Sequence, residues 1–137
     1  MKRSDIRGGI DTSVLVRLLT GDPELLSKQA FSYLAETQSQ GRHLLVSDLV
    51  ISEAYFACQH HYKMPKNALL AGLHKMLAEP IFVLDAGVLN LLSQPGPASA
   101  KPGFVDRLIY ADYASQGARL VTFEKSAANL LDVDVLA

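Results

Sequence analysis

Apolar residues along the chain fall into two kinds of segment that alternate. Short, wholly apolar runs such as 44–46 are typical of strands buried on both faces of a parallel sheet. Longer segments between them carry apolar residues every three or four positions, as amphipathic helices do. The pattern predicts helices over 12–20, 23–38, 48–57, 65–79, 86–92, 104–116 and 126–131, and strands just before Asp11 and over 44–46, 81–84, 119–123 and 133–136.

This alternation predicts an α/β fold with three layers, α/β/α, around a mostly parallel sheet of four to five strands. A length of 137 residues suits one domain, so we expect residues 1–137 to form a single domain. The stretch from Ser93 to Gly103 holds three prolines and two glycines. We interpret it as a loop within that domain, because the remainder is too short to fold alone.

The composition limits the binding partners and the cellular compartment that we expect for the protein. Lysine and arginine number 13 against 14 acidic residues, so any nucleic acid must be met by a local patch of positive charge. The single cysteine, Cys58, excludes an internal disulfide and a multi-cysteine zinc site, which fits a reducing cytoplasm. No signal peptide and no apolar run of about 20 residues is visible, so we expect a cytoplasmic protein without a membrane span.

Four acidic residues fall where the predicted strands end. Asp11 follows the first strand, Glu53 lies early in the helix after the second, Asp106 lies in the first turn of the helix before the fourth, and Glu124 follows the fourth. The carboxyl ends of parallel strands gather at one edge of a sheet, where functional residues collect. We therefore expect these four side chains to form one site.

Four neighbouring carboxylates repel one another unless a cation neutralises them. Oxygen ligands without histidine or thiolate favour Mg²⁺ or Mn²⁺ over zinc or copper. Such an ion activates water and balances charge on a phosphodiester. The predicted chemistry is metal-dependent phosphodiester hydrolysis.

Four short motifs resemble those of the PIN-domain family, in particular its VapC-type toxins. They are Asp11-Thr12-Ser13-Val14-Leu15, Ser52-Glu53, Phe104-Val105-Asp106-Arg107-Leu108-Ile109 and Leu120-Val121-Thr122-Phe123-Glu124. The resemblance implies an endoribonuclease that uses Mg²⁺ or Mn²⁺, that a cognate antitoxin protein inhibits, and that is usually a homodimer. It also implies that Asp11, Glu53, Asp106 and Glu124 hold the metal and that Ser13 assists them.

Other readings of these residues stay open. Any one of the acids can instead cap a helix, and Glu53 can be an ordinary surface residue. Glu124 stands where the family more often has aspartate, which favours a PIN-like module that binds RNA or a protein without cleavage. A flavodoxin-like phospho-receiver is a third possibility, but it requires adjacent acids after the first strand, and Asp11-Thr12 offers one.

The basic residues Lys101, Arg107 and Lys125 flank the predicted site and are candidates for binding RNA phosphates, although solvated charge explains each of them as well. The helices of the first half are rich in Leu, Phe and Ala. They either pack in the core or form a groove for an antitoxin segment or a second subunit.

Overall fold

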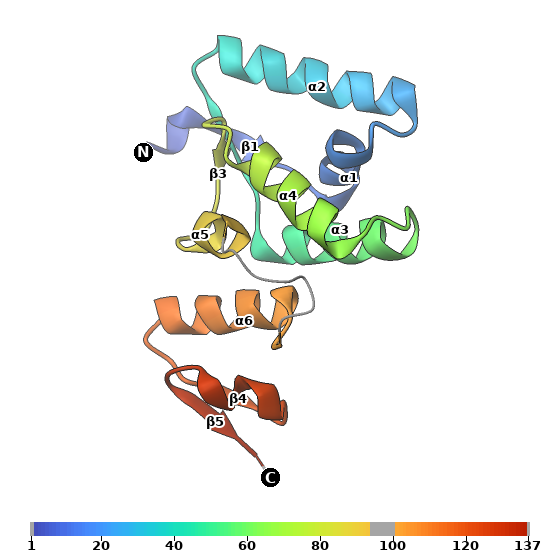
Figure 1. The fold of residues 1–137 in the computed structure, drawn as a ribbon. Coiled ribbons are helices and arrows are strands. Elements are labelled where there is room, and N and C mark those ends of the chain that lie inside the picture. The colour runs from blue at the N-terminus through green and yellow to red at the C-terminus, as the bar shows by residue number, and fades with distance from the viewer. Residues whose placement is uncertain (1, 94–100, 137) are drawn as a thin grey trace. The chain divides into compact units, whose positions relative to one another are not determined.

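A computed structural model describes residues 2–93 and 101–136 of the chain (Figure 1). The chain forms two compact units, Met1–Asp85 and Ala86–Ala137, and each is described here by itself. That residues 1–137 make up a single domain stays a prediction. Most of the predicted loop from Ser93 to Gly103, namely residues 94–100, lies outside the described residues.

The first unit is a three-stranded parallel sheet with four α-helices. Its elements are the 3₁₀ helix η1 (Arg3–Asp5), β1 (Ile6–Gly9), α1 (Thr12–Thr20), α2 (Glu24–Ser39), β2 (His43–Leu45), α3 (Asp48–His60), α4 (Lys66–Leu77) and β3 (Phe82–Val83). The strand order is β1-β2-β3, with β2 in the middle. The pairing register shifts between Ile6 and Gly8, after which Gly8 pairs with Leu44 and Gly9 with Leu45.

The core of this unit lies where helix α1 meets its neighbours. Helix α1 packs against α2, α3 and α4. Leu15, Leu44, Ile51, Leu69 and Leu73 are almost completely buried. Burying side chains of this size contributes roughly 1.5–3 kcal/mol each, so these contacts fix where the start of α1 stands relative to the sheet.

Local signals set the ends of the helices. Asp11 caps α1, and Ser47 caps α3 by accepting a hydrogen bond from the Val50 amide. Helix α1 ends at Gly21, whose φ of 69° is left-handed and therefore suits glycine. Helix α2 begins at Glu24, with Pro23 at its N-cap.

The apolar side chains of α2 lie at the surface of this chain. Leu25 is 68% exposed, and Leu26 and Phe31 are also exposed. The residues of α2 that are buried are Ser27 and Thr37. Of the two readings that the sequence left open for this helix, core packing is therefore wrong for Leu25, Leu26 and Phe31.

In its described residues, the second unit combines two α-helices and a 3₁₀ helix with a two-stranded parallel sheet. Its elements are α5 (Val88–Ser93), α6 (Phe104–Ser115), β4 (Leu120–Thr122), the 3₁₀ helix η2 (Lys125–Asn129) and β5 (Val133–Val135). Arg119 forms ion pairs with Asp132 and Asp134 beside these strands. The Tyr110 hydroxyl of α6 donates a hydrogen bond to the Leu131 carbonyl, 2.8 Å away, which fastens the helix to the segment before β5.

The predicted α/β class with parallel strand pairing is confirmed. All five predicted strands are present, although they form a sheet of three in the first unit and a sheet of two in the second. Within the described part of the chain, no helix combines the length and the hydropathy that crossing a membrane requires.

Candidate functional site

Asp11 lies at the carboxyl end of strand β1, as predicted, and begins helix α1. The Ile10 amide still donates to the Leu45 carbonyl of β2, 3.0 Å away, so the chain leaves the sheet immediately before Asp11. The Asp11 Oδ1 atom accepts hydrogen bonds from the Val14 amide at 3.2 Å and from the Ser13 hydroxyl at 2.6 Å. The structure thus brings Ser13 and Asp11 into direct contact.

These hydrogen bonds lower the pKa of the Asp11 carboxyl. The Ser13 hydroxyl makes the largest contribution, the Val14 amide adds to it, and the charge of Arg17 acts in the same direction. Asp11 is exposed and therefore ionised at neutral pH. Both of these bonds end on Oδ1. An ionised, exposed carboxylate suits a hard divalent cation.

Asp11 and Ser13 line a pocket of about 600 Å³ in the first unit. Residues of β1, α1 and α2 form its walls, and Leu44 of β2 contributes as well. The polar groups in the walls besides Asp11 and Ser13 belong to Arg17, Gln29 and Tyr33. The sequence did not predict these three residues as part of the site. Arg17 belongs to α1 and the other two to α2, so their positions in one pocket depend on how the two helices pack.

Glu53 also belongs to the first unit. It lies in α3, the helix that packs against α1, and its side chain is exposed. Its neighbours Val50, Ile51 and Ala54 are apolar. The helix turns Ile51 and Ala54 into the core and leaves Glu53 at the surface.

The other two predicted ligands, Asp106 and Glu124, belong to the second unit. Asp106 lies exposed in the first turn of α6. Glu124 caps η2, where its Oε1 accepts hydrogen bonds from the Ser126 hydroxyl at 2.8 Å and the Ser126 amide at 3.2 Å. The Ser126 hydroxyl is the main cause of a lowered pKa at Glu124, to which the charge of Lys101 also contributes. A single site built from all four acids stays a prediction.

Of the three predicted phosphate-binding residues, Arg107 is engaged elsewhere. Its Nε donates to the Pro102 carbonyl at 2.8 Å, and a terminal nitrogen approaches the Lys101 carbonyl at 3.4 Å. The guanidinium therefore holds the backbone before α6. Lys101 and Lys125 are exposed, so a role for them in RNA binding stays a prediction.

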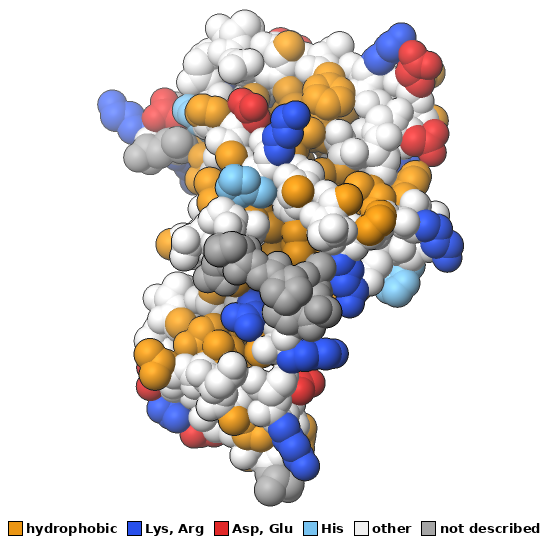
Figure 2. Space-filling model, viewed as in Figure 1, with side chains coloured by type: hydrophobic (Ala, Val, Ile, Leu, Met, Phe, Trp, Pro, Cys, Tyr) orange, Lys and Arg blue, Asp and Glu red, His pale blue; other side chains and the backbone are white. Residues whose placement is uncertain are grey.

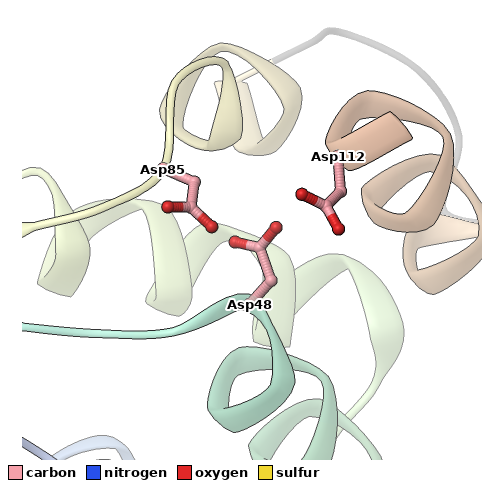
Figure 3. A group of neighbouring side chains, drawn as sticks. All are labelled: Asp48, Asp85 and Asp112. Atoms are coloured by element: carbon pink, nitrogen blue, oxygen red, sulfur yellow. The ribbon is translucent and has the colours of Figure 1, made fainter. Parts of the chain in front are cut away.

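A second pair of acids in the first unit was not singled out from the sequence. Asp48, at the start of α3, and Asp85, after β3, have carboxylate oxygens within 4.8 Å of each other (Figure 3). Asp112, the third residue labelled in Figure 3, belongs to α6 of the second unit and is exposed. Asp85 directly follows the predicted strand over 81–84. The expectation that acids at strand ends form a site, which pointed to Asp11, therefore applies to Asp85 as well.

A second cavity, of about 540 Å³, lies among α1, α2 and α4. Its lining is mainly apolar and includes Leu19, Phe31, Leu34 and Met76. Figure 2 shows hydrophobic side chains at the surface of the first unit, on the face that it shares with the view of α2 and α4 in Figure 1. The groove is separate from the pocket at Asp11 and offers no carboxylate cluster.

No family model matches the sequence, and no curated protein or solved structure matches it either.

Proposed function

We propose that this protein is an endoribonuclease that depends on Mg²⁺ or Mn²⁺ and acts as the toxin of a type II toxin–antitoxin pair, like the VapC-type PIN domains that its motifs resemble. The observation that carries the proposal is the ionised Asp11 carboxylate at the end of β1, hydrogen-bonded to Ser13 and opening onto a pocket of about 600 Å³. In open α/β sheets, ligands bind beyond the carboxyl ends of the strands, which is where Asp11 lies.

Asp11 and Glu53 would hold the metal from the first unit. When bound, the ion would lower the pKa of a water molecule and balance charge on the scissile phosphodiester. The chain's own residues prepare this site: the Ser13 hydroxyl keeps Asp11 ionised and orients its carboxylate, and the pocket provides space for a substrate beside it. Asp106 and Glu124 are proposed as further ligands, to be tested through variants of their own.

The apolar groove among α1, α2 and α4 supports the proposed protein partners. Phe31 is 46% exposed at its edge, and the exposed Leu25 belongs to the same helix. An amphipathic antitoxin segment would bury these side chains, as helices do in apolar grooves of this kind. The homodimer is proposed on the resemblance alone, and light scattering of the purified protein tests it.

The test is cleavage of single-stranded and structured RNA by the purified protein in Mg²⁺ or Mn²⁺. We expect cleavage that EDTA abolishes and that Asp11→Asn reduces by about 100-fold or more, since this variant loses the carboxylate that would hold the metal, and with it the positive charge that would offset the charge of the transition state. Asp22→Asn is the matched control, because Asp22 is exposed at the other end of α1. Cleavage that persists in EDTA or in Asp11→Asn contradicts the metal mechanism.

One observation favours the second candidate, a module that binds RNA or a protein without cleaving RNA. Asp11 and Glu124 both cap helices. This structural role is by itself a sufficient reason for an acidic residue at each position. RNA binding without cleavage in any divalent metal supports this module. A short reading frame upstream that encodes a DNA-binding protein would instead support the toxin.

A further inference from the structure

We propose that the pocket beside Asp11 is a nucleotide subsite, which receives one base of an RNA strand between α1 and α2 while Arg17 binds the phosphate of that nucleotide. The inference rests on the proposed function for its RNA ligand, and it assigns residues that no metal or catalytic role requires. Three observations carry it: the character of the pocket, the glycine in its strand wall and the charge of Arg17.

The pocket has the size and lining of a small-molecule site. Its volume of about 600 Å³ lies within the range of about 300–1,000 Å³ that is common for such sites. Ile10, Val14, Leu26 and Ala30 give it apolar walls, which suit the flat face of an unstacked base. A base seated here would lie beside Asp11, and its phosphate would be held close to the carboxylate proposed to bind the metal.

Gly8 forms part of the strand wall of the pocket, next to the register shift between Ile6 and Gly8, and neither a left-handed φ angle nor close packing requires a glycine there. Its φ angle is not left-handed, unlike those of Gly21 or Gly41. A Cβ atom added at Gly8 would meet no heavy atom of the described residues within 4 Å. Glycine weakens a strand and often marks a place where a ligand approaches the backbone. Here it keeps the pocket open beside Leu44.

Arg17 provides positive charge at the pocket. Arg7 and Arg119 are held by acidic side chains, whereas in the described parts of the chain Arg17 forms no ion pair. One of its nitrogens lies 3.5 Å from the Ser13 carbonyl, one turn earlier in α1. A guanidinium in this position offers paired donors to a phosphate and offsets the repulsion between that phosphate and Asp11.

The α2 wall supplies groups that can read a base. Gln29 offers an amide donor and acceptor, and Tyr33 a phenol. Arg7 orients the Tyr33 ring: its guanidinium carbon lies 3.9 Å from the ring centroid, and it donates to Thr37 Oγ1 at 2.9 Å. Single-stranded bases are recognised by contacts of this kind.

The experiment measures binding in EDTA, so that cleavage does not contribute. The probes are fluorescein-labelled five-nucleotide RNAs, read by fluorescence anisotropy. Arg17→Gln and Gly8→Val should each weaken binding by about tenfold or more, because the first removes a charge-assisted contact and the second fills the base site. Arg3→Gln and Gly72→Leu are the matched controls, since Arg3 is exposed in η1 and Gly72 lines the other cavity.

An abasic ribose-phosphate strand of equal length tests the phosphate contact at Arg17 separately from the base contact in the pocket. Its binding should be weaker than that of RNA, insensitive to Gly8→Val and still sensitive to Arg17→Gln. RNA carrying 4-thiouridine should crosslink to the peptide that contains Gln29 and Tyr33. Melting curves show whether Gly8→Val folds, and if it does not, the Arg17→Gln and crosslinking results decide.

The outcomes separate this inference from the proposed function. Normal RNA binding by both variants overturns the subsite even where wild-type protein cleaves RNA. Binding that depends on Arg17 and Gly8 without any cleavage supports the subsite and contradicts the ribonuclease. A nucleoside monophosphate that competes as strongly as the five-nucleotide RNA shows a pocket for free nucleotides and overturns an RNA strand as its occupant.

Discussion

Asp11 has two roles that a substitution can separate. As the N-cap of α1 it satisfies the Val14 amide, and as an ionised carboxylate it is the proposed metal ligand. Asparagine accepts the capping hydrogen bond almost as well as aspartate, whereas alanine does not. The negative charge matters for the metal and much less for the cap, so the two variants distinguish the roles.

We expect Asp11→Asn to leave the free energy of unfolding within a few tenths of a kcal/mol and Asp11→Ala to lower it by about 0.5–1 kcal/mol, a low figure because the cap is exposed. Both variants should lose Mn²⁺ binding. Urea unfolding and the electron paramagnetic resonance of Mn²⁺ measure the two effects. If both variants bind Mn²⁺ as the wild type does, Asp11 is a helix cap and not a metal ligand.

Cys58 is a second residue whose surroundings dictate its chemistry. Its side chain is 0% exposed in α3, and burial raises the pKa of the thiol. Because the thiolate is the reactive form, Cys58 should react with Ellman's reagent at pH 8 at least about 100-fold more slowly than an exposed cysteine, through opening of the fold. Ser39→Cys, at the exposed end of α2, is the control. Rapid labelling of Cys58 would contradict the packing of α3.

Elements defined by local signals were predictable from the sequence, and those defined by distant contacts were less so. The start of α3 follows from the onset of an apolar helical pattern at residue 48, and the structure assigns the cap to Ser47. Asp11 of the candidate site follows in the same way, from a strand end and a helix start, whereas Ser13 follows from the resemblance to the PIN-domain motifs. The pocket residue Arg17 does not, since its partners Gln29 and Tyr33 come from a helix whose crossing angle is set by packing.

Strand pairing and helix exposure show the same limit. The apolar pattern located β4 and β5, but it carries no information on which strands pair, because pairing depends on residues far apart. The periodicity of α2 indicated a helix and did not reveal that Leu25 and Phe31 face away from the core. An apolar stripe looks the same whether the chain itself or a partner covers it.

In the second unit, an ion pair makes the β4–β5 element sensitive to acid. Hydrogen bonds from Arg119 are the main cause of a lowered pKa at Asp134, below its ordinary value of 3.8. A carboxyl whose pKa is lower in the folded state stabilises the fold above its unfolded pKa and loses this effect as the pH falls through the folded value. Both side chains are about half exposed, so the effect is modest.

We therefore expect Asp134→Asn to increase hydrogen exchange of the β4 and β5 amides at pH 7, and the difference from wild type to shrink from about pH 4 downward. Asp112→Asn is the control, as an exposed acid in the same unit. A difference that persists unchanged at the lowest pH would show that Asp134 acts by packing and not by charge.

Across the whole molecule, charge is balanced: 13 basic residues stand against 14 acidic ones, and several of the basic residues are paired within the chain. RNA binding by such a protein cannot depend on a broad field of positive charge, and must depend on few phosphate contacts and on pocket contacts with bases. Salt titration distinguishes these two modes, because each neutralised phosphate releases counterions.

For single-stranded RNA the logarithm of the binding constant should fall with the logarithm of salt concentration at a slope of about −0.7 per phosphate, so one or two contacts predict a slope of about −0.7 to −1.4. Arg17→Gln should make the slope shallower by about 0.7, whereas Arg3→Gln should leave it unchanged. Anisotropy titrations between low and moderate salt measure it. A slope steeper than about −3 would require at least four phosphate contacts. That result would show that RNA binds to a wider basic surface and not mainly in the pocket.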